Sequence, residues 1–149
     1  METTYQAVRL PAFAVNRTRR LVKSPKLYWS DTALAMFLAG ESEPRGVHLE
    51  NLVLSDLLAW RDIQARRPEI LYWRTATGLE VDLVVETPGR LLPIEVKSGI
   101  RVDPSDARGL EAFLDEYPDL ADGGLLLYGG WEVSPLTRRV LAAPWWSLC

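Results

Sequence analysis

The stretch LEVDLVVETPGRLLPIEVKSG, residues 79–99, constrains the fold more than any other part of the chain. Two apolar runs flank Pro88-Gly89, and charged side chains interrupt both runs at alternate positions. Such alternation is typical of β-strands, and Thr-Pro-Gly-Arg is typical of a hairpin connection. We therefore expect two antiparallel strands joined by a short turn.

The turn also predicts which residues oppose one another across the hairpin. With Pro88-Gly89 at the tip, the expected pairs are Thr87 with Arg90, Glu86 with Leu91, Val84 with Pro93, Asp82 with Glu95, and Glu80 with Lys97. Opposed residues share one face of a sheet, with Cβ atoms roughly 5 Å apart. The predicted charged face carries Glu80, Asp82, Glu95 and Lys97, and the predicted core face carries Val81, Leu83, Val85, Ile94 and Val96.

Asp82 and Glu95 are the informative pair, because opposed like charges destabilise a sheet. A cation is therefore expected between them. A divalent metal ion would serve, and so would the ammonium group of Lys97, which lies two residues beyond Glu95. The residues alone leave both alternatives open.

Length and composition indicate one soluble globular domain. The chain has 149 residues, of which 48% are apolar and 25% charged, and this is ordinary for a folded domain. No apolar run approaches the roughly 18 residues of a membrane span, and the start lacks a signal-peptide pattern. Cys149 is the single cysteine, so no internal disulfide or cysteine-rich zinc site is expected, and a cytoplasmic setting fits.

The N-terminal part of the chain differs from the rest in charge. Residues 1–26 are predicted to form a basic arm, and residues 27–149 the folded domain. The arm contains no sustained hydrophobic period, and Pro11, Asn16 and Ser24-Pro25 interrupt it. Its basic side chains would suit nucleic-acid phosphates, or the arm is a solvated connecting segment. The candidate phosphate-binding residues are Arg17, Arg19, Arg20, Lys23 and Lys26.

Hydrophobic periodicity predicts the remaining elements. The expected order is a strand at 26–29, a helix from Asp31 to Gly40, a helix at 47–61, a strand at 70–75, the hairpin, a helix capped by Asp103, a strand at 124–129 and a broken edge strand. A strand, helix and strand in succession imply a parallel pair with a right-handed crossover. The predicted class is α/β, with a mixed central sheet flanked by helices.

The helix at 47–61 carries one anomalous residue. Val53, Leu54, Leu57 and Trp60 form its predicted apolar stripe, with Asn51 toward the opposite side. Glu50 falls inside that stripe. A carboxylate on a packing face costs several kcal/mol unless a partner compensates it. Glu50 is therefore a candidate site residue.

Three segments carry a resemblance to a known family: SPKLYWSDTALA, YWRTATGLEVDLVVE and LLPIEVKSG. They resemble the C-terminal domain of unknown function of prokaryotic AAA-type ATPases, and the order of elements and charged residues resembles the PD-(D/E)xK nuclease-like superfamily. Its motif corresponds to Glu50, then Glu80-Val81-Asp82, then Ile94-Glu95-Val96-Lys97, with Val81 in place of the proline. The chain has no G-x-x-x-x-G-K-[ST] sequence, so it lacks a P-loop and resembles the terminal piece alone.

The resemblance implies a restriction-endonuclease-like αβββαβ core and a Mg²⁺- or Mn²⁺-dependent hydrolysis of DNA phosphodiesters. Asp82, Glu95 and the backbone carbonyl of Val96 would be the metal ligands, because Mg²⁺ prefers such oxygens. Glu50 would hold a water on that ion or a second ion. Lys97 would orient the attacking water or stabilise negative charge on the phosphate.

Two other functions remain open at this point. One is a non-catalytic accessory module that binds nucleic acid or docks to an ATPase partner. The other is a dimerisation domain that forms a homo-oligomer. No membrane partner is expected.

Overall fold

The computed structural model describes residues 6–15 and 24–148. Its centre is a six-stranded sheet in the order β3-β4-β5-β6-β8-β7. The strands are β3 (Glu69–Arg74), β4 (Glu80–Thr87), β5 (Arg90–Lys97), β6 (Gly124–Tyr128), β7 (Ser134–Pro135) and β8 (Val140–Pro144). A separate two-stranded ribbon pairs β1 (Ala7–Leu10) with β2 (Lys26–Trp29).

The sheet is mixed, as the sequence predicts. β3, β4 and β5 are antiparallel neighbours, β6 runs parallel to β5, β8 runs parallel to β6, and β7 is an antiparallel edge strand. The parallel β5–β6 pair, which needs a crossover, confirms the expected strand, helix and strand unit. The chain is an α/β domain.

Three helices accompany the sheet: α2 (Thr32–Ala39), α3 (Gly46–Asp62) and α4 (Arg108–Glu116). The predicted caps are confirmed. The Asp31 side chain accepts a hydrogen bond from the Leu34 amide at 2.9 Å, and Gly40 ends α2 with a φ of 68°. Asp103 accepts from the Ser105 amide at 2.7 Å and opens a short 3-10 turn, η2 (Pro104–Ala107), before α4. A second such turn, η3 (Trp145–Leu148), follows β8.

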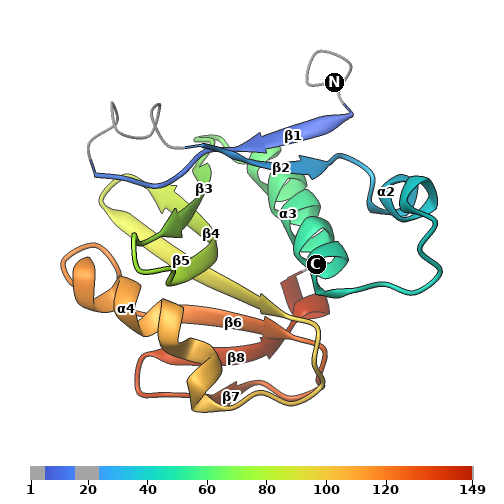
Figure 1. Ribbon diagram of the computed structural model, residues 1–149. Helices are drawn as coiled ribbons and strands as arrows, with labels where there is room; N and C mark the ends of the chain where they lie inside the picture. The colour runs from blue at the N-terminus through green and yellow to red at the C-terminus, as the bar shows by residue number, and fades with distance from the viewer. Residues whose placement is uncertain (1–5, 16–23, 149) are drawn as a thin grey trace.

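Of these helices, α3 and α4 cover opposite faces of the sheet (Figure 1). On one face α4 contributes the wholly buried Leu110, Phe113 and Leu114 to a core with β4 and β6. On the other face α3 and the β1–β2 ribbon enclose a second core. The predicted stripe of α3 is buried at Val53, Leu54 and Leu57 but is wrong at Trp60, which is 41% exposed.

Part of the predicted N-terminal arm contributes to these cores. Leu10 and Ala12 pack in the core beneath α3, and Phe13 packs in the core beneath α4. Ala12 also forms a parallel bridge with Tyr72 of β3. These contacts anchor the segment that follows β1 to the sheet. No helix in the described part of the chain combines the length and apolar character that crossing a membrane requires.

Candidate functional site

The candidate site lies at the end of the β4–β5 hairpin, where four elements meet. α3 contributes Glu50, β4 contributes Asp82, and β5 contributes Glu95 and Lys97. β2, which packs beside α3 through Tyr28, contributes Lys26. Residues distant in the sequence are therefore brought together by the packing of β2 and α3 against the sheet.

A β-bulge in β4 determines where Asp82 lies. Leu71 pairs with Val84 and Trp73 with Val81, so the register between β3 and β4 shifts at this point. Asp82 and Leu83 together oppose the single residue Tyr72. An extra residue in one strand locally re-aims the side chains.

The bulge corrects the predicted assignment of faces. Val81 packs in the α4 core, whereas Leu83, Val85, Ile94 and Val96 pack in the α3 core. The prediction that all five share one face is therefore wrong at Val81. Because the alternation breaks, the carboxylate of Asp82 lies on the same side of the sheet as Leu83.

The hairpin register follows the prediction only as far as the bulge. The pairs Thr87–Arg90, Glu86–Leu91 and Val84–Pro93 are confirmed, and the ladder ends at Leu83–Ile94. Beyond this point the Val96 amide donates to Oδ2 of Asp82 at 2.9 Å. The aspartate side chain thus accepts a hydrogen bond from the neighbouring strand, and the predicted direct pairs of Asp82 with Glu95 and of Glu80 with Lys97 do not form.

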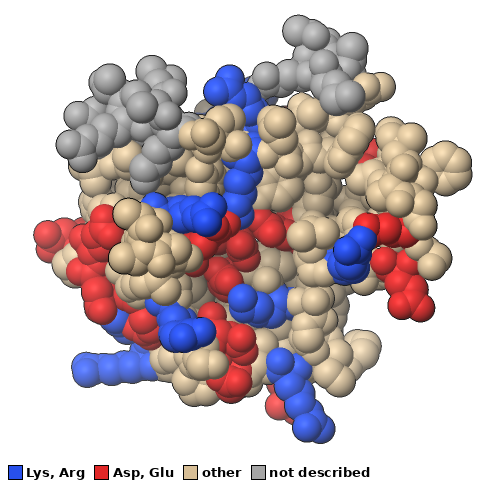
Figure 2. All heavy atoms as spheres, in the orientation of Figure 1, with Lys and Arg blue, Asp and Glu red and all other residues tan. Residues whose placement is uncertain are grey.

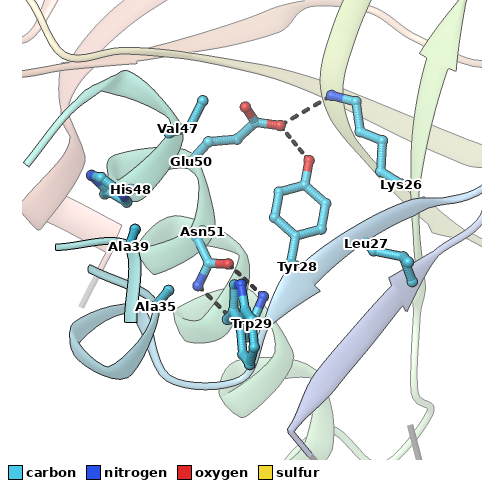
Figure 3. Close-up of a pocket in the computed structure, with 10 residues that line it drawn as sticks. All are labelled: Lys26, Leu27, Tyr28, Trp29, Ala35, Ala39, Val47, His48, Glu50 and Asn51. Atoms are coloured by element: carbon cyan, nitrogen blue, oxygen red, sulfur yellow. Dashed lines mark hydrogen bonds and ion pairs between the residues drawn. The ribbon is translucent and has the colours of Figure 1, made fainter. Parts of the chain in front are cut away.

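Lys26 is the centre of the acidic cluster. Its Nζ atom lies 3.0 Å from Oε1 of Glu50 and 3.8 Å from Oδ1 of Asp82, and it also forms an ion pair with Glu80. The hydroxyl of Tyr28 donates to the same Glu50 oxygen (Figure 3). Glu50, predicted as a costly carboxylate on a packing face, is compensated by these two partners.

Glu95 and Lys97 form the other half of the site. Lys97 Nζ donates to Oε1 of Glu95 at 2.8 Å. Glu95 is only 9% exposed, and its second carboxylate oxygen, Oε2, is buried without a hydrogen-bond partner. Buried polar atoms nearly always have a partner, so this oxygen fits a further ligand such as a water or a cation.

The two strand acids also have unusual proton affinities. Burial raises the pKa of Asp82 to about 7, and the negative charges of Glu95 and Glu50 add to that rise, while the Val96 amide and Lys26 oppose it. Burial likewise raises the pKa of Glu95 and the charge of Glu50 adds to that rise, while Lys97 and the Asp82 amide oppose it. Carboxylates that resist ionisation in this way are typical of functional sites.

The lysines are held in their charged form. Burial lowers the pKa of Lys26, but the carboxylates of Glu80, Glu50 and Asp82 outweigh that effect and raise it overall. For Lys97 the same balance of burial against Glu95 and Asp82 gives a raised pKa. Burial and the adjacent Glu50 carboxylate raise the pKa of the Tyr28 hydroxyl, which stays a hydrogen-bond donor.

A cleft of about 430 Å³ adjoins this cluster. It lies between β2, α2 and α3, and Lys26, Tyr28 and Glu50 line it together with Ala35 and Ala39 of α2 (Figure 3). The acidic cluster is therefore open to molecules from one side. Figure 2 shows acidic side chains gathered near the middle of this face of the molecule, with basic side chains among and around them.

Asn51 lines the cleft, and the predicted orientation of its side chain is wrong. Instead of facing away from the core, Asn51 is 6% exposed. Its side chain accepts from the Trp29 amide and donates to the Trp29 carbonyl, both at 2.9 Å, and it donates to Oγ1 of Thr32 at 2.7 Å. These bonds fix the end of β2 against α3, and hence the positions of Lys26 and Tyr28.

Lys26 and Tyr28 are the functional candidates that sequence reasoning missed or misplaced. Lys26 was predicted only as a phosphate-binding residue of the arm, and Tyr28 was not singled out. Their spacing of two within the strand-like Lys-Leu-Tyr-Trp could have indicated a shared face. The other predicted phosphate-binding residues, Arg17, Arg19, Arg20 and Lys23, lie outside the described residues.

The donor atoms suit a hard cation with few protein ligands. Within residues 6–15 and 24–148, no three His, Cys, Asp or Glu side chains are grouped so that they could hold a metal ion by themselves. Mg²⁺ is nevertheless commonly held by only one or two carboxylates, with waters and substrate phosphates as its other ligands. Asp82 and Glu95 meet that requirement, and the unpartnered Oε2 of Glu95 fits it.

The fold and site together define a class: an α/β domain with a buried cluster of acids and lysines at the end of a bulged hairpin. Comparison with known proteins names the family. Residues 45–148 match the model of the domain of unknown function DUF4143, and the chain belongs to this family.

Two curated relatives extend the similarity toward the N-terminus. They are the uncharacterized protein Rv2008c of Mycobacterium tuberculosis and the uncharacterized protein Mb2031c of Mycobacterium bovis. Each is 36% identical to this chain over 143 residues, which cover 90% of the chain and 30% of the relative. The chain thus spans less than a third of the length of these relatives. No solved structure matches the chain.

Proposed function

We propose that this chain is a nuclease-like domain that hydrolyses DNA phosphodiesters with Mg²⁺ or Mn²⁺. The observation that carries the proposal is the buried, unpartnered Oε2 of Glu95 beside the carboxylate of Asp82, whose side chain is only 15% exposed. Two adjacent buried acids are costly without a cation. The order α3, β3, β4, β5, α4, β6 supports a restriction-endonuclease-like αβββαβ core.

Each site residue has a role in this proposal. Asp82 and Glu95 hold the cation, with the backbone carbonyl of Val96 as a further ligand. Such a cation, when bound, polarises a phosphate oxygen and lowers the pKa of a water. Lys97, which is hydrogen-bonded to Glu95, places a positive charge where negative charge develops on the phosphate. Glu50 holds Lys26 and Tyr28 at the mouth of the cleft.

The relation to an ATPase is part of the same proposal. Since the matched relatives are more than three times the length of the matched region, the domain is one piece of such proteins. We propose that in them it is joined to an AAA-type ATPase domain. The nuclease-like site would then act on DNA that the ATPase part engages.

The experiment that tests the proposal is metal-dependent cleavage of plasmid and oligonucleotide DNA. The wild-type chain is compared with Asp82→Asn and Glu95→Gln, which retain side-chain shape but remove the charge that holds a metal. The matched control is Asp119→Asn, which neutralises an exposed carboxylate of the α4–β6 connection. Cleavage that needs Mg²⁺ or Mn²⁺, survives in the control and is lost in both site variants supports the proposal. Cleavage that is absent, or equal in all four proteins, refutes it.

A second candidate function is a non-catalytic module that docks to an ATPase partner or binds nucleic acid without cutting it. The observation that favours it is Lys26, whose ammonium group already neutralises part of the acidic cluster. Calorimetric titration with Mn²⁺ distinguishes the two. A wild-type chain that binds no Mn²⁺ favours the module, whereas binding that Asp82→Asn abolishes favours the nuclease.

A further inference from the structure

The ammonium group of Lys26 and one oxygen of Asp82 face each other. Asp82 has two carboxylate oxygens with different partners: Oδ2 accepts from the Val96 amide at 2.9 Å, whereas Oδ1 lies 3.8 Å from Nζ of Lys26. Because the hairpin already uses Oδ2, Oδ1 is the oxygen that Asp82 can offer to a metal ion. The lysine therefore lies beside the oxygen that the proposed metal would need.

Lys26 is held at this point by several contacts. Besides Asp82, its Nζ binds Glu50 at 3.0 Å and pairs with Glu80, and it lies 5.5 Å from the centre of the Tyr72 ring. The hydroxyl of Tyr72 in turn donates to the Ser24 carbonyl at 2.6 Å, which fixes the start of β2. The lysine side chain is 26% exposed, so water screens its ion pairs only in part.

We propose that Lys26 is the internal counter-cation of this site, and that a divalent cation displaces its ammonium group from Asp82 when it binds. This inference rests on the proposed metal site and adds a competitor to it. The two cations compete because both need Oδ1 of Asp82 and two positive charges at one carboxylate oxygen repel each other. The displaced ammonium group has room to move, since Lys26 also lines the adjoining cleft.

The proposal has two consequences that follow from charge alone. Without metal, Lys26 stabilises the fold by compensating Glu50, Glu80 and Asp82, so its removal lowers the melting temperature. With metal, the same lysine opposes binding, so its removal tightens binding. A lysine that is merely structural would change the first quantity without improving the second.

The test is Mn²⁺ binding to the full 149-residue chain, measured by calorimetry and by the loss of the electron paramagnetic resonance signal of free Mn²⁺. Lys26→Met keeps an unbranched side chain one atom shorter than lysine and removes its charge. We expect its dissociation constant for Mn²⁺ to be about tenfold lower than that of the wild type. Its metal-free melting temperature should be lower than that of the wild type, and Mn²⁺ should raise it by more.

Three further variants make the measurement decisive. Lys26→Arg keeps the positive charge and should bind Mn²⁺ as weakly as the wild type. Arg90→Met removes a cation from the exposed pair with Asp122 at the hairpin tip and should leave the affinity unchanged. If Lys26→Met does not fold without metal, Lys26→Met with Glu80→Gln removes the lysine and one of its acids together, and the same gain in affinity is expected.

The outcomes separate this inference from the proposed function. Tighter binding by Lys26→Met or by its double variant supports the inference, including the case in which only these variants bind Mn²⁺. Equal or weaker binding than in a metal-binding wild type overturns it while the metal site stands. Absence of Mn²⁺ binding in the wild type and in every variant refutes the proposed metal site. It also refutes the proposed competition between Lys26 and a divalent cation.

Discussion

The two faces of the central sheet differ in the kinds of side chain that pack against them. Beneath α4 the core is apolar and rich in aromatic rings, with Phe113 in contact with Phe13, Trp73 and Tyr117 at centroid distances of 4.8 to 5.8 Å. Beneath α3 the core is apolar near Val53, Leu54 and Leu57 but changes at its β2 end into the cluster around Lys26.

This difference shows how the fold tolerates its own site. Close packing of large apolar side chains stabilises a domain, whereas burial of Asp82 and Glu95 raises the pKa of both and disfavours their charged forms. The α4 face therefore supplies the stability that the β2 end of the α3 face lacks. Truncation of a side chain in the α4 core should therefore lower the stability, whereas neutralisation of the Asp82 carboxylate should raise it at high pH.

The largest effect is expected from Phe113→Ala on the α4 face. Phe113 is wholly buried and contacts three other rings, so its truncation leaves a large cavity. We expect a loss of about 3–5 kcal/mol in the free energy of unfolding, measured by urea denaturation. The loss should be the same at pH 5 and pH 8 because no titrating group contacts the ring through a charge. A loss below about 1 kcal/mol would contradict the assigned role of this face.

At high pH, Asp82→Asn should change the free energy of unfolding in the opposite direction and stabilise the chain. The pKa of Asp82 in the folded chain is about 7, against 3.8 for the free group. Between these values the folded chain binds more protons than the unfolded chain, so the stability of the wild type falls as pH rises. Asparagine cannot ionise, and its side-chain oxygen can still accept from Val96.

We therefore expect metal-free Asp82→Asn to be more stable than the wild type at pH 8 by about 2–4 kcal/mol, and to show no such gain at pH 4. Urea denaturation across this pH range, with a chelator present, measures both values. A residual slope should remain in the variant, because Glu95 also has a raised pKa. A variant that is less stable than the wild type at pH 8 would show that the site does not destabilise the fold.

The structural features that the sequence predicts correctly are those determined by residues close together along the chain. The hairpin pairs near Pro88-Gly89 were predicted because the turn alone determines them, and the caps Asp31, Gly40 and Asp103 were predicted because a cap acts within one turn. The helix that follows Asp103 was likewise predicted from the hydrophobic period of its own residues. Each of these predictions is confirmed.

The parts that failed depend on contacts between distant segments. The bulge at Asp82 arises from pairing with β3, so the alternation of β4 alone could not reveal that Val81 changes face. Asn51 was placed wrongly because its partners, Trp29 of β2 and Thr32 of α2, lie on other elements. Lys26 meets Glu50 across 24 residues of sequence, and its charge alone does not indicate which acids it meets. The acids of the motif could be chosen from the sequence, but not their internal cation.

The close packing of α4 against β4 can be tested at Gly109 of α4. A Cβ atom at this position would overlap the carbonyl oxygen of Glu80, because α4 approaches β4 closely there. We expect Gly109→Ala to cost about 1–3 kcal/mol through overpacking, and to weaken Mn²⁺ binding by moving the strand that carries Asp82. The control is Gly46→Ala in α3, where a Cβ atom would meet only Ser98 Oγ at an ordinary 3.5 Å. Equal stability of both variants would refute the close approach.

The smallest effect is expected from Arg90→Gln, and it sharpens the contrast between ion pairs in two settings. Arg90 and Asp122 lie 2.8 Å apart, but their side chains are 76% and 81% exposed. Exposed pairs are screened by water and salt, so we expect a change within about 0.5 kcal/mol by urea denaturation. Lys26 forms pairs of similar length with side chains that are 15% to 29% exposed, and its neutralisation should have the larger effect. If both substitutions change stability equally, distance rather than burial determines the strength of these pairs, and the distinction between the site and the surface is lost.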